Sequence, residues 1–150
     1  MSKTGALIWK ATLGELNAEA PFDVTEKRFR HPLLTDSIPA RVEALDTTGD
    51  GFANRLYVGD TGGRVWRGDM GGDDPAAWTF SPLFSVGRHD TASVVTDRRF
   101  FHGVDMVPVR SPGANFDAVI IGSGNRADPV ERVQRNHLYA FRDTRLGSLR

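Results

Sequence analysis

The segment DTTGDGFAN, residues 46–54, has the composition and spacing of a loop that can bind a hard cation. Oxygen-bearing side chains at alternate positions can wrap around such an ion, and Gly51 allows the sharp turn that the wrapping needs. The oxygens would come from Asp46, Thr48, Asp50, the carbonyl of Phe52 and the side chain of Asn54. Only two of these ligands carry a charge, so the spacing predicts a Ca²⁺ site of weak affinity.

This loop is not an EF-hand, and a simpler interpretation stays open beside the calcium one. The twelfth position is Tyr57, where an EF-hand has a bidentate Glu, and the flanking segments have the composition of strands instead of helices. Asp and Gly are also common in tight turns between strands, since Asp accepts hydrogen bonds from nearby backbone N–H groups. The same residues therefore fit either a calcium loop or an ordinary turn.

A second motif, Gly122-x-Gly124-x-x-Ala127, follows an apolar segment as in a dinucleotide-binding fold. The helix that such a fold requires would cover 127–135, and this stretch contains Pro129 and few apolar residues. It is too short and too polar to pack on a sheet. We therefore interpret the motif as the glycine-rich end of a strand.

Other chemistry-bearing residues form no recognisable catalytic group. Arg67-Gly68-Asp69 matches the tripeptide that integrins read on exposed loops, but it closes an expected strand and is interpreted as a chance match. The histidines, which have no metal-pair spacing, are His31, His89, His102 and His137. No set of nucleophile, acid and base stands out, so we expect a protein that is not an enzyme.

Composition favours a turn-rich β protein. The 150 residues include 16 Gly and 8 Pro, which break helices, and no Cys, which excludes disulfides and thiol chemistry. Lys plus Arg equals Asp plus Glu at 19 each, so a strongly basic nucleic-acid or membrane-surface binder is excluded. Apolar runs are far shorter than the roughly 20 residues of a membrane helix, and the N-terminus has no secretory signal pattern.

Short segments of β-branched and aromatic residues, separated by glycine turns, predict the strands. We expect them at 6–13, 42–45, 55–59, 64–67, 78–80, 83–86, 100–109, 118–121 and 138–141. Residues 14–40 are expected to be a long connection with little regular structure, and 123–136 a polar loop. The DTGG turn at 60–63 predicts a hairpin in which Gly62 and Gly63 take positive φ.

The order of these segments repeats. A strand ending in Asp46, a second ending in VGD and a third ending in Asp69 have later counterparts in HGVDMVPV, FDAVIIGSG and NHLYAFRD. Such units predict an all-β fold of antiparallel four-stranded blades, a partial β-propeller of about two and a half blades. The domains expected are 1–40, the end of a preceding blade with a long connection, 41–86, a complete blade with the calcium-type loop, and 87–150, an incomplete blade.

An open set of blades leaves apolar faces uncovered, because each blade packs its face against a neighbour. We therefore expect the chain to be a segment of a longer protein that supplies the remaining blades, or to need partners. Trp66, Trp78 and Tyr139 are expected to pack between blades.

Several separated motifs resemble, in collinear order over residues 37–143, the C-terminal propeller of the PilC/PilY family of type IV pilus proteins. They are ALDTTGDGFANRLYVGDTGGRVWRGDM, DRRFFHGVDMVPV, FDAVIIGSGNRADPV and NHLYAFRD. The resemblance implies a modified β-propeller, a place on the surface of Gram-negative bacteria, and a role in pilus biogenesis, extension and retraction, and adhesion. It also implies Ca²⁺ at the loop 46–54, where Thr48 and Asn54 replace acids usual in the family.

The function expected is thus a non-enzymatic segment that contacts pilus proteins, such as minor pilins or the pilus tip, or a host surface. Nucleic-acid binding and membrane insertion are not expected. Two alternatives remain open: a fragment of a quinoprotein-type propeller enzyme, which would need a cofactor pocket built by several blades, and a generic propeller interaction scaffold.

Overall fold

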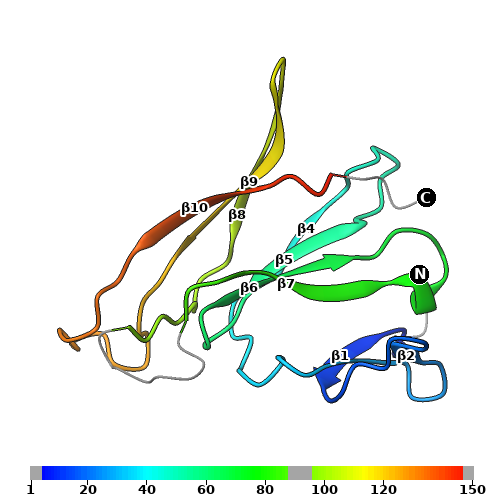
Figure 1. The fold of residues 1–150 in the computed structure, drawn as a ribbon, viewed down its shortest axis with the longest axis horizontal. Helices are drawn as coiled ribbons and strands as arrows, with labels where there is room; N and C mark the ends of the chain where they lie inside the picture. The colour runs from blue at the N-terminus through cyan, green and yellow to red at the C-terminus, as the bar shows by residue number, and fades with distance from the viewer. Residues whose placement is uncertain (1–4, 88–95, 147–150) are drawn as a thin grey trace.

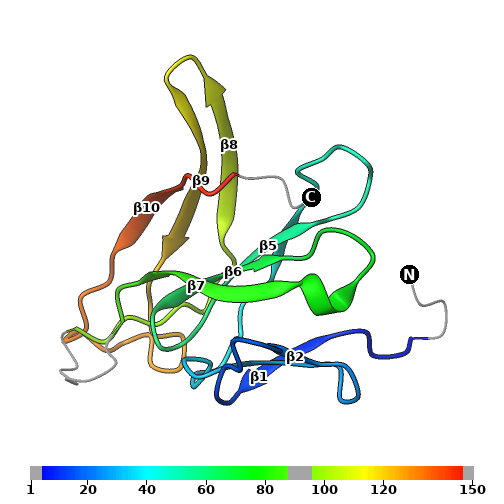
Figure 2. The same cartoon turned by 45° about the vertical axis from the view of Figure 1, so that its right-hand side comes forward.

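A computed structural model describes residues 5–87 and 96–146, and it is all-β, with no α-helix in those residues (Figure 1). Three sheets lie in successive layers, with sheet B between sheets A and C (Figures 1 and 2). Sheet A consists of β1 (Lys10–Leu13), β2 (Phe22–Asp23) and β3 (Arg28–His31). Sheet B consists of β4 (Glu43–Leu45), β5 (Arg55–Gly59), β6 (Arg64–Asp69) and β7 (Thr79–Ser85). Sheet C consists of β8 (Asp105–Ser111), β9 (Ala114–Gly122) and β10 (Leu138–Asp143).

Sheet B is a four-stranded antiparallel meander in the order β4-β5-β6-β7. The turn between β5 and β6 is held by Asp60, whose Oδ1 accepts hydrogen bonds from the N–H groups of Gly62 and Arg64 at 2.9 and 2.8 Å. Gly63 takes φ 79°, as expected, but Gly62 does not have positive φ. A Cβ at Gly62 would instead displace the carboxylate of Asp36, which packs against this glycine.

Sheet A departs from the expected blade pattern. β1 pairs with β3 in parallel, and only β2 and β3 are antiparallel. The connection 14–40, which was expected to have little regular structure, contains the two short strands β2 and β3. These strands are two and four residues long, too short for a pattern of alternating polarity to predict them.

Aromatic side chains fill the space between sheets A and B. Trp66 stacks on Phe80 with ring centroids 5.0 Å apart, and the ring of His31 meets Trp66 edge-on at 5.1 Å. Phe29 from sheet A stacks on Trp9, which in turn contacts Phe80. The expectation that Trp66 packs between sheets is confirmed.

A second core cluster lies between sheets B and C. Its fully buried side chains are Tyr57, Val65, Phe100, Val104, Val119 and Ile121. Phe84 of sheet B stacks on Phe141 of sheet C at 4.5 Å, and Phe100 meets Tyr139 edge-on at 6.0 Å. Tyr139 therefore also packs between sheets, as expected, whereas Trp78 is half-buried and donates to the carbonyl of Gly72.

Residues at equivalent ladder positions of sheets B and C face the preceding sheet, which is sheet A for sheet B and sheet B for sheet C. In sheet B, Val58 pairs with Trp66, and both face sheet A. In sheet C, the pair Ile121 and Tyr139 has the same place in the ladder, next to a glycine at the end of the second strand, and faces sheet B. The two sheets therefore stack in the same sense, each turning the same face to its predecessor.

The strand ends differ modestly from those expected. β7 is one strand that passes through Pro82, where two segments were expected, and the register shifts at Val65/Trp66 on the neighbouring strand. Because Pro has no N–H group, it is tolerated on this edge strand of the sheet. The β8–β9 hairpin begins later and runs further than expected, with Gly113 at φ 79° in its turn.

Candidate functional site

The loop 46–54 joins β4 to β5 and closes on itself at its base. The N–H of Asn54 donates to the carbonyl of Leu45 at 2.8 Å, and the N–H of Met70 donates to the carbonyl of Asn54 at 2.7 Å. The second bond ties the loop to the end of β6. The candidate ligands thus lie on a segment whose two ends are fixed by sheet B.

Asp46 organises the loop through its carboxylate. Oδ1 accepts from the N–H groups of Thr48 and Gly49 at 3.0 and 2.6 Å, and Oδ2 accepts from that of Gly51 at 2.7 Å. Gly49 and Gly51 have φ of 78° and 87°, which a side chain would strain. The backbone bond from Gly51, followed by those from Gly49 and Thr48, lowers the pKa of Asp46 below its usual value, so the carboxylate is charged at neutral pH.

The remaining candidate ligands also make hydrogen bonds within the loop. Asp50 Oδ1 accepts from the N–H of Phe52 at 2.9 Å. Asn54 Oδ1 accepts from the N–H and hydroxyl of Thr47 at 3.0 and 2.8 Å, while Asn54 Nδ2 donates to the hydroxyl of Thr48 at 3.1 Å. Of the five candidate ligands, Asp46, Thr48 and Asn54 are linked directly by hydrogen bonds, whereas the Asp50 carboxylate bonds the N–H of Phe52.

The arrangement offers a hard cation two carboxylates and several neutral oxygens, which are ligands that Ca²⁺ accepts. Across residues 5–87 and 96–146, no group of three or more His, Cys, Asp or Glu side chains is placed to hold a metal. A cation here would depend on Asp46 and Asp50 for charge, and Asn54 Oδ1 would have to turn away from Thr47 to join them.

Sequence reasoning missed a buried ionic network between sheets B and C. Arg55 Nη1 donates to Asp117 Oδ2 at 3.0 Å, and Arg67 Nη1 donates to Asp143 Oδ2 at 2.6 Å. Both arginines also bond Asp69, so two guanidinium groups are shared among three carboxylates. Each pair joins a strand of sheet B to a strand of sheet C.

The hydroxyl of Tyr57 lies within the same network. It donates to Asp143 Oδ2 at 2.8 Å and lies 3.4 Å from Asp117 Oδ2. Burial and the bond to Asp143 raise the pKa of Tyr57 far above its usual value, so the hydroxyl keeps its proton. Asp117 and Asp143 are each 1% exposed.

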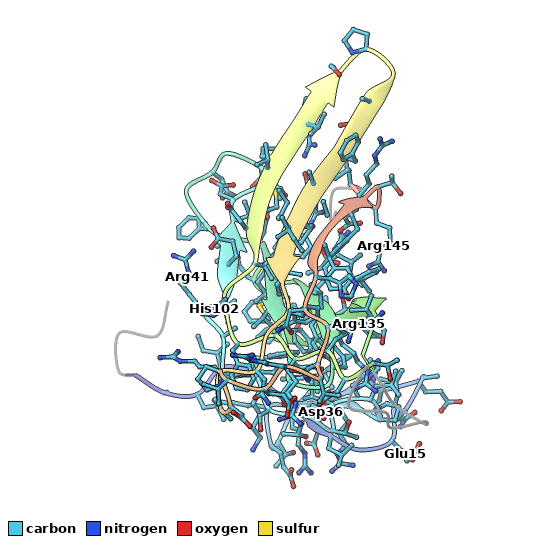
Figure 3. All side chains as sticks on the ribbon, turned by 90° about the vertical axis from the view of Figure 1, so that its left-hand side faces the viewer. Glu15, Asp36, Arg41, His102, Arg135 and Arg145 are labelled. Atoms are coloured by element: carbon cyan, nitrogen blue, oxygen red, sulfur yellow. The ribbon has the colours of Figure 1, made fainter. Side chains whose placement is uncertain are left out.

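Burial acts to raise the pKa of Asp143, but its hydrogen bonds outweigh this effect. The hydroxyl of Tyr57, the backbone N–H of Arg145 and the guanidinium of Arg67 together hold the pKa of Asp143 below its usual value. Arg145 lies just beyond the end of sheet C (Figure 3). The one available sequence signal was the placement of Asp69 and Asp143 at equivalent strand ends.

Arg67-Gly68-Asp69 lies within β6, and Arg67 is buried in this network. The tripeptide is therefore not displayed on an exposed loop, in agreement with its interpretation as a chance match. Gly68 has no room for a side chain, because a Cβ there would lie 2.7 Å from Leu56 Cγ.

Asp60 forms another buried polar centre, between β5 and β6. In addition to its backbone bonds, its Oδ2 accepts from Trp66 Nε1 at 2.7 Å. Burial raises the pKa of Asp60 above its usual value. Arg64 Nη1 bonds Asp36 at 3.0 Å, and Asp36 lies low in Figure 3, beside sheet A. This cluster links the turn to the segment that precedes β4.

The loop 123–136 contains no helix after Gly124, so the structure does not support the dinucleotide fingerprint. Ser123 instead pairs with His137 across the base of the loop. The described histidines lie apart from one another in the sequence and form no metal group among the residues placed by the structure. Burial, with a smaller effect of Arg64, lowers the pKa of His31, and His89 lies outside the described residues.

Comparison of the chain with protein-family models, with curated proteins and with solved structures finds no match. In the described ranges, no helix has the length and apolar character needed to cross a membrane. The structure shows an all-β fold of three stacked sheets.

Proposed function

We propose that the three sheets are successive blades of a β-propeller, with sheet B a complete blade. The observation that carries this proposal is the shared register of sheets B and C, in which equivalent pairs face the preceding sheet. Stacking of successive antiparallel sheets in one sense is how propeller blades pack around an axis. Sheet A, with its parallel pair, would be an irregular or partial blade.

Within that architecture, we propose a non-enzymatic protein of the PilC/PilY kind that acts in type IV pilus biogenesis, in the balance of extension and retraction, and in adhesion. The support is the collinear set of motifs over residues 37–143, which the fold distributes over sheets B and C and the segment between them. The partners would be minor pilins, other pilus-tip proteins or a host surface, and the protein would act at the cell surface.

Ca²⁺ would modulate this activity through the loop 46–54. Bound Ca²⁺ would neutralise Asp46 and Asp50 and hold the loop in one conformation. Arg55 directly follows the loop and bonds Asp117 of sheet C, so a fixed loop would also fix one end of the contact between the two sheets. The proposed effect is a stiffer pair of blades when Ca²⁺ is present.

Deleting the gene in the bacterium that encodes it tests the pilus role. We expect electron microscopy to show fewer surface pili, with recovery when the wild-type gene is restored. Unchanged piliation and unchanged surface motility would reject the pilus role while leaving the propeller architecture open.

Thermal unfolding with and without Ca²⁺ tests the metal part separately. We expect about 10 mM Ca²⁺ to raise Tm by roughly 3–5 °C if the site is of the weak class. The shift should shrink in Asp50→Ala and persist in the matched control Asp73→Ala, which removes an exposed carboxylate elsewhere. An equal shift in both variants would exclude this loop as the binding site.

A further inference from the structure

The loop 123–136 borders an open hollow of about 310 Å³ beside the start of β10. Its polar lining comprises His102, Asn125, Arg126, Asp128, Glu131, Gln134 and Asn136. This loop joins β9 to β10 and lies at the opposite end of the strands from the loop 46–54 (Figure 1). His102 and Arg135, labelled in Figure 3, mark this end of sheet C.

Two amide oxygens at this hollow are buried without a hydrogen-bond donor. Gln134 is only 6% exposed, and its Oε1 has no partner. Asn125 Oδ1 is likewise buried and without a partner. A buried acceptor that has lost its hydrogen bonds to water is unfavourable unless something positive meets it. A hydrogen-bond donor or a cation next to these two oxygens would therefore be stabilising.

Two carboxylates line the same hollow, and neither forms an ion pair with a described basic side chain. Glu131 Oε1 accepts from the N–H of Val133 at 2.5 Å, which leaves its other oxygen unengaged. Asp128 donates its backbone N–H to the carbonyl of Asn125 at 3.2 Å, which brings these two residues together. The hollow thus combines two carboxylates and two unsatisfied neutral oxygens with one guanidinium, that of Arg126, so its lining is negative by one charge.

This combination selects the class of ligand. A set made of carboxylate and amide oxygens suits a hard cation, and Ca²⁺ accepts six to eight such ligands, including Asn and Gln carbonyls and water. His102 is the only imidazole in the lining, so a transition metal finds fewer of the nitrogen and sulfur ligands it prefers.

We propose that the hollow of the loop 123–136 is a divalent-cation site for Ca²⁺, with Asn125, Gln134, Asp128 and Glu131 supplying the oxygens. The site is independent of the loop 46–54 and of the pilus role. Ca²⁺ would fix a long polar connection that is otherwise held by few hydrogen bonds to the sheet.

The test is Ca²⁺-dependent thermal unfolding of the whole chain in the Asp50→Ala background, which removes the contribution of the loop 46–54. We expect about 10 mM CaCl₂ to raise Tm by a few degrees in this background, and MgCl₂ at the same concentration to have a clearly smaller effect. Adding Asp128→Asn and Glu131→Gln should abolish the shift. Both positions lie at the surface or partly so, and the changes keep side-chain size.

Gln134→Glu provides the complementary variant, since a third carboxylate should enlarge the Ca²⁺-induced shift in Tm if a cation binds beside it. A variant that folds only with Ca²⁺ also supports the site. If Gln134→Glu fails to fold under both conditions, the pair Asp128→Asn and Glu131→Gln decides the question. Three outcomes would overturn the proposal: no Ca²⁺-induced shift in Tm in the Asp50→Ala background, a shift that remains after Asp128→Asn and Glu131→Gln are added, or an equal shift with Mg²⁺. The first outcome would not decide whether the loop 46–54 binds Ca²⁺.

Discussion

At the scale of single residues, we expect substitutions in the charged network between sheets B and C to change the stability of the fold most. Four of its members, Arg55, Arg67, Asp117 and Asp143, are almost fully removed from water, where an ion is stable only with close partners. Such networks are costly to break on one side, because removing one partner leaves the other charge buried and unpaired.

Replacing Asp143 by Asn should therefore destabilise the fold strongly. The variant loses the negative charge that Arg67 faces at 2.6 Å and one acceptor of the Tyr57 hydroxyl. Because Arg67 keeps its bonds to Asp69, we expect a loss of about 1.5–3 kcal/mol in the free energy of unfolding, measured by urea denaturation. Asp105→Asn, at an exposed carboxylate on β8, is the control and should change stability by less than about 0.5 kcal/mol.

The same carboxylate predicts a dependence on pH. The folded-state pKa of Asp143 lies below its usual value, so the ionised carboxylate stabilises the folded protein. This contribution to the free energy of unfolding is fully present above about pH 4 and is lost as the pH falls through the folded-state pKa. Stability measured between pH 7 and pH 2 should therefore fall more steeply in the wild type than in Asp143→Asn. Parallel curves for the two proteins would contradict this assignment.

At the scale of elements, glycines decide how closely the sheets approach. Gly59 ends β5 beneath sheet C, and a Cβ there would lie 2.6 Å from Phe100 Cβ and 2.8 Å from Ile121 Cδ1. Gly122 ends β9 at the equivalent position of sheet C, and a Cβ there would meet nothing within 4 Å. The difference reflects what covers each sheet: sheet C covers Gly59, and no described residue covers Gly122.

This pair gives a matched test of the stacking. Gly59→Ala should cost about 1–3 kcal/mol by overpacking the interface between the sheets. Gly122→Ala should stay within about 0.5 kcal/mol of the wild type. Chemical denaturation of the two variants provides the measurement, and equal effects would mean that sheet C does not pack on sheet B as described.

At the scale of the whole molecule, the outward face of sheet C is largely apolar, and no other sheet of the described residues covers it. It presents Val107, Val109, Phe116, Ala118, Ile120 and Leu138 on alternate positions, away from sheet B. Two charged residues, Asp105 and Arg142, also lie on this face, and the guanidinium of Arg142 lies 4.8 Å from the ring centre of Phe116. Val107 and Leu138 are 50% and 77% exposed. In the ladder register, Ile120 and Leu138 correspond to Tyr57 and Val65 of sheet B, which are fully buried under sheet C.

The isolated chain should therefore self-associate through this face. We expect sedimentation velocity to show concentration-dependent oligomers in the wild type and mostly monomers in Val107→Lys, because a charge on the face opposes its burial. Val24→Lys is the control, since Val24 is 72% exposed in the turn between β2 and β3, on a different sheet. A monomeric wild type, or equal effects of both variants, would reject association through sheet C.

The sequence alone determined the local part of this structure. β5, the glycine turn at 60–63, the polar loop 123–136 and the equivalence of Trp66 with Tyr139 follow from residues adjacent in the chain, where turn chemistry and alternation act directly. The candidate ligands of the loop 46–54 were also predicted by spacing, and their hydrogen bonds within the loop are local as well.

Only the tertiary structure decided the rest. The parallel pairing of β1 with β3 and the meeting of Arg55 with Asp117, 62 residues apart, depend on which distant segments pack together. A buried arginine and an exposed one look alike in a sequence, because burial is a property of the neighbours that folding supplies. For the same reason, the sequence could not predict that Gln134 Oε1 is buried without a hydrogen-bond donor.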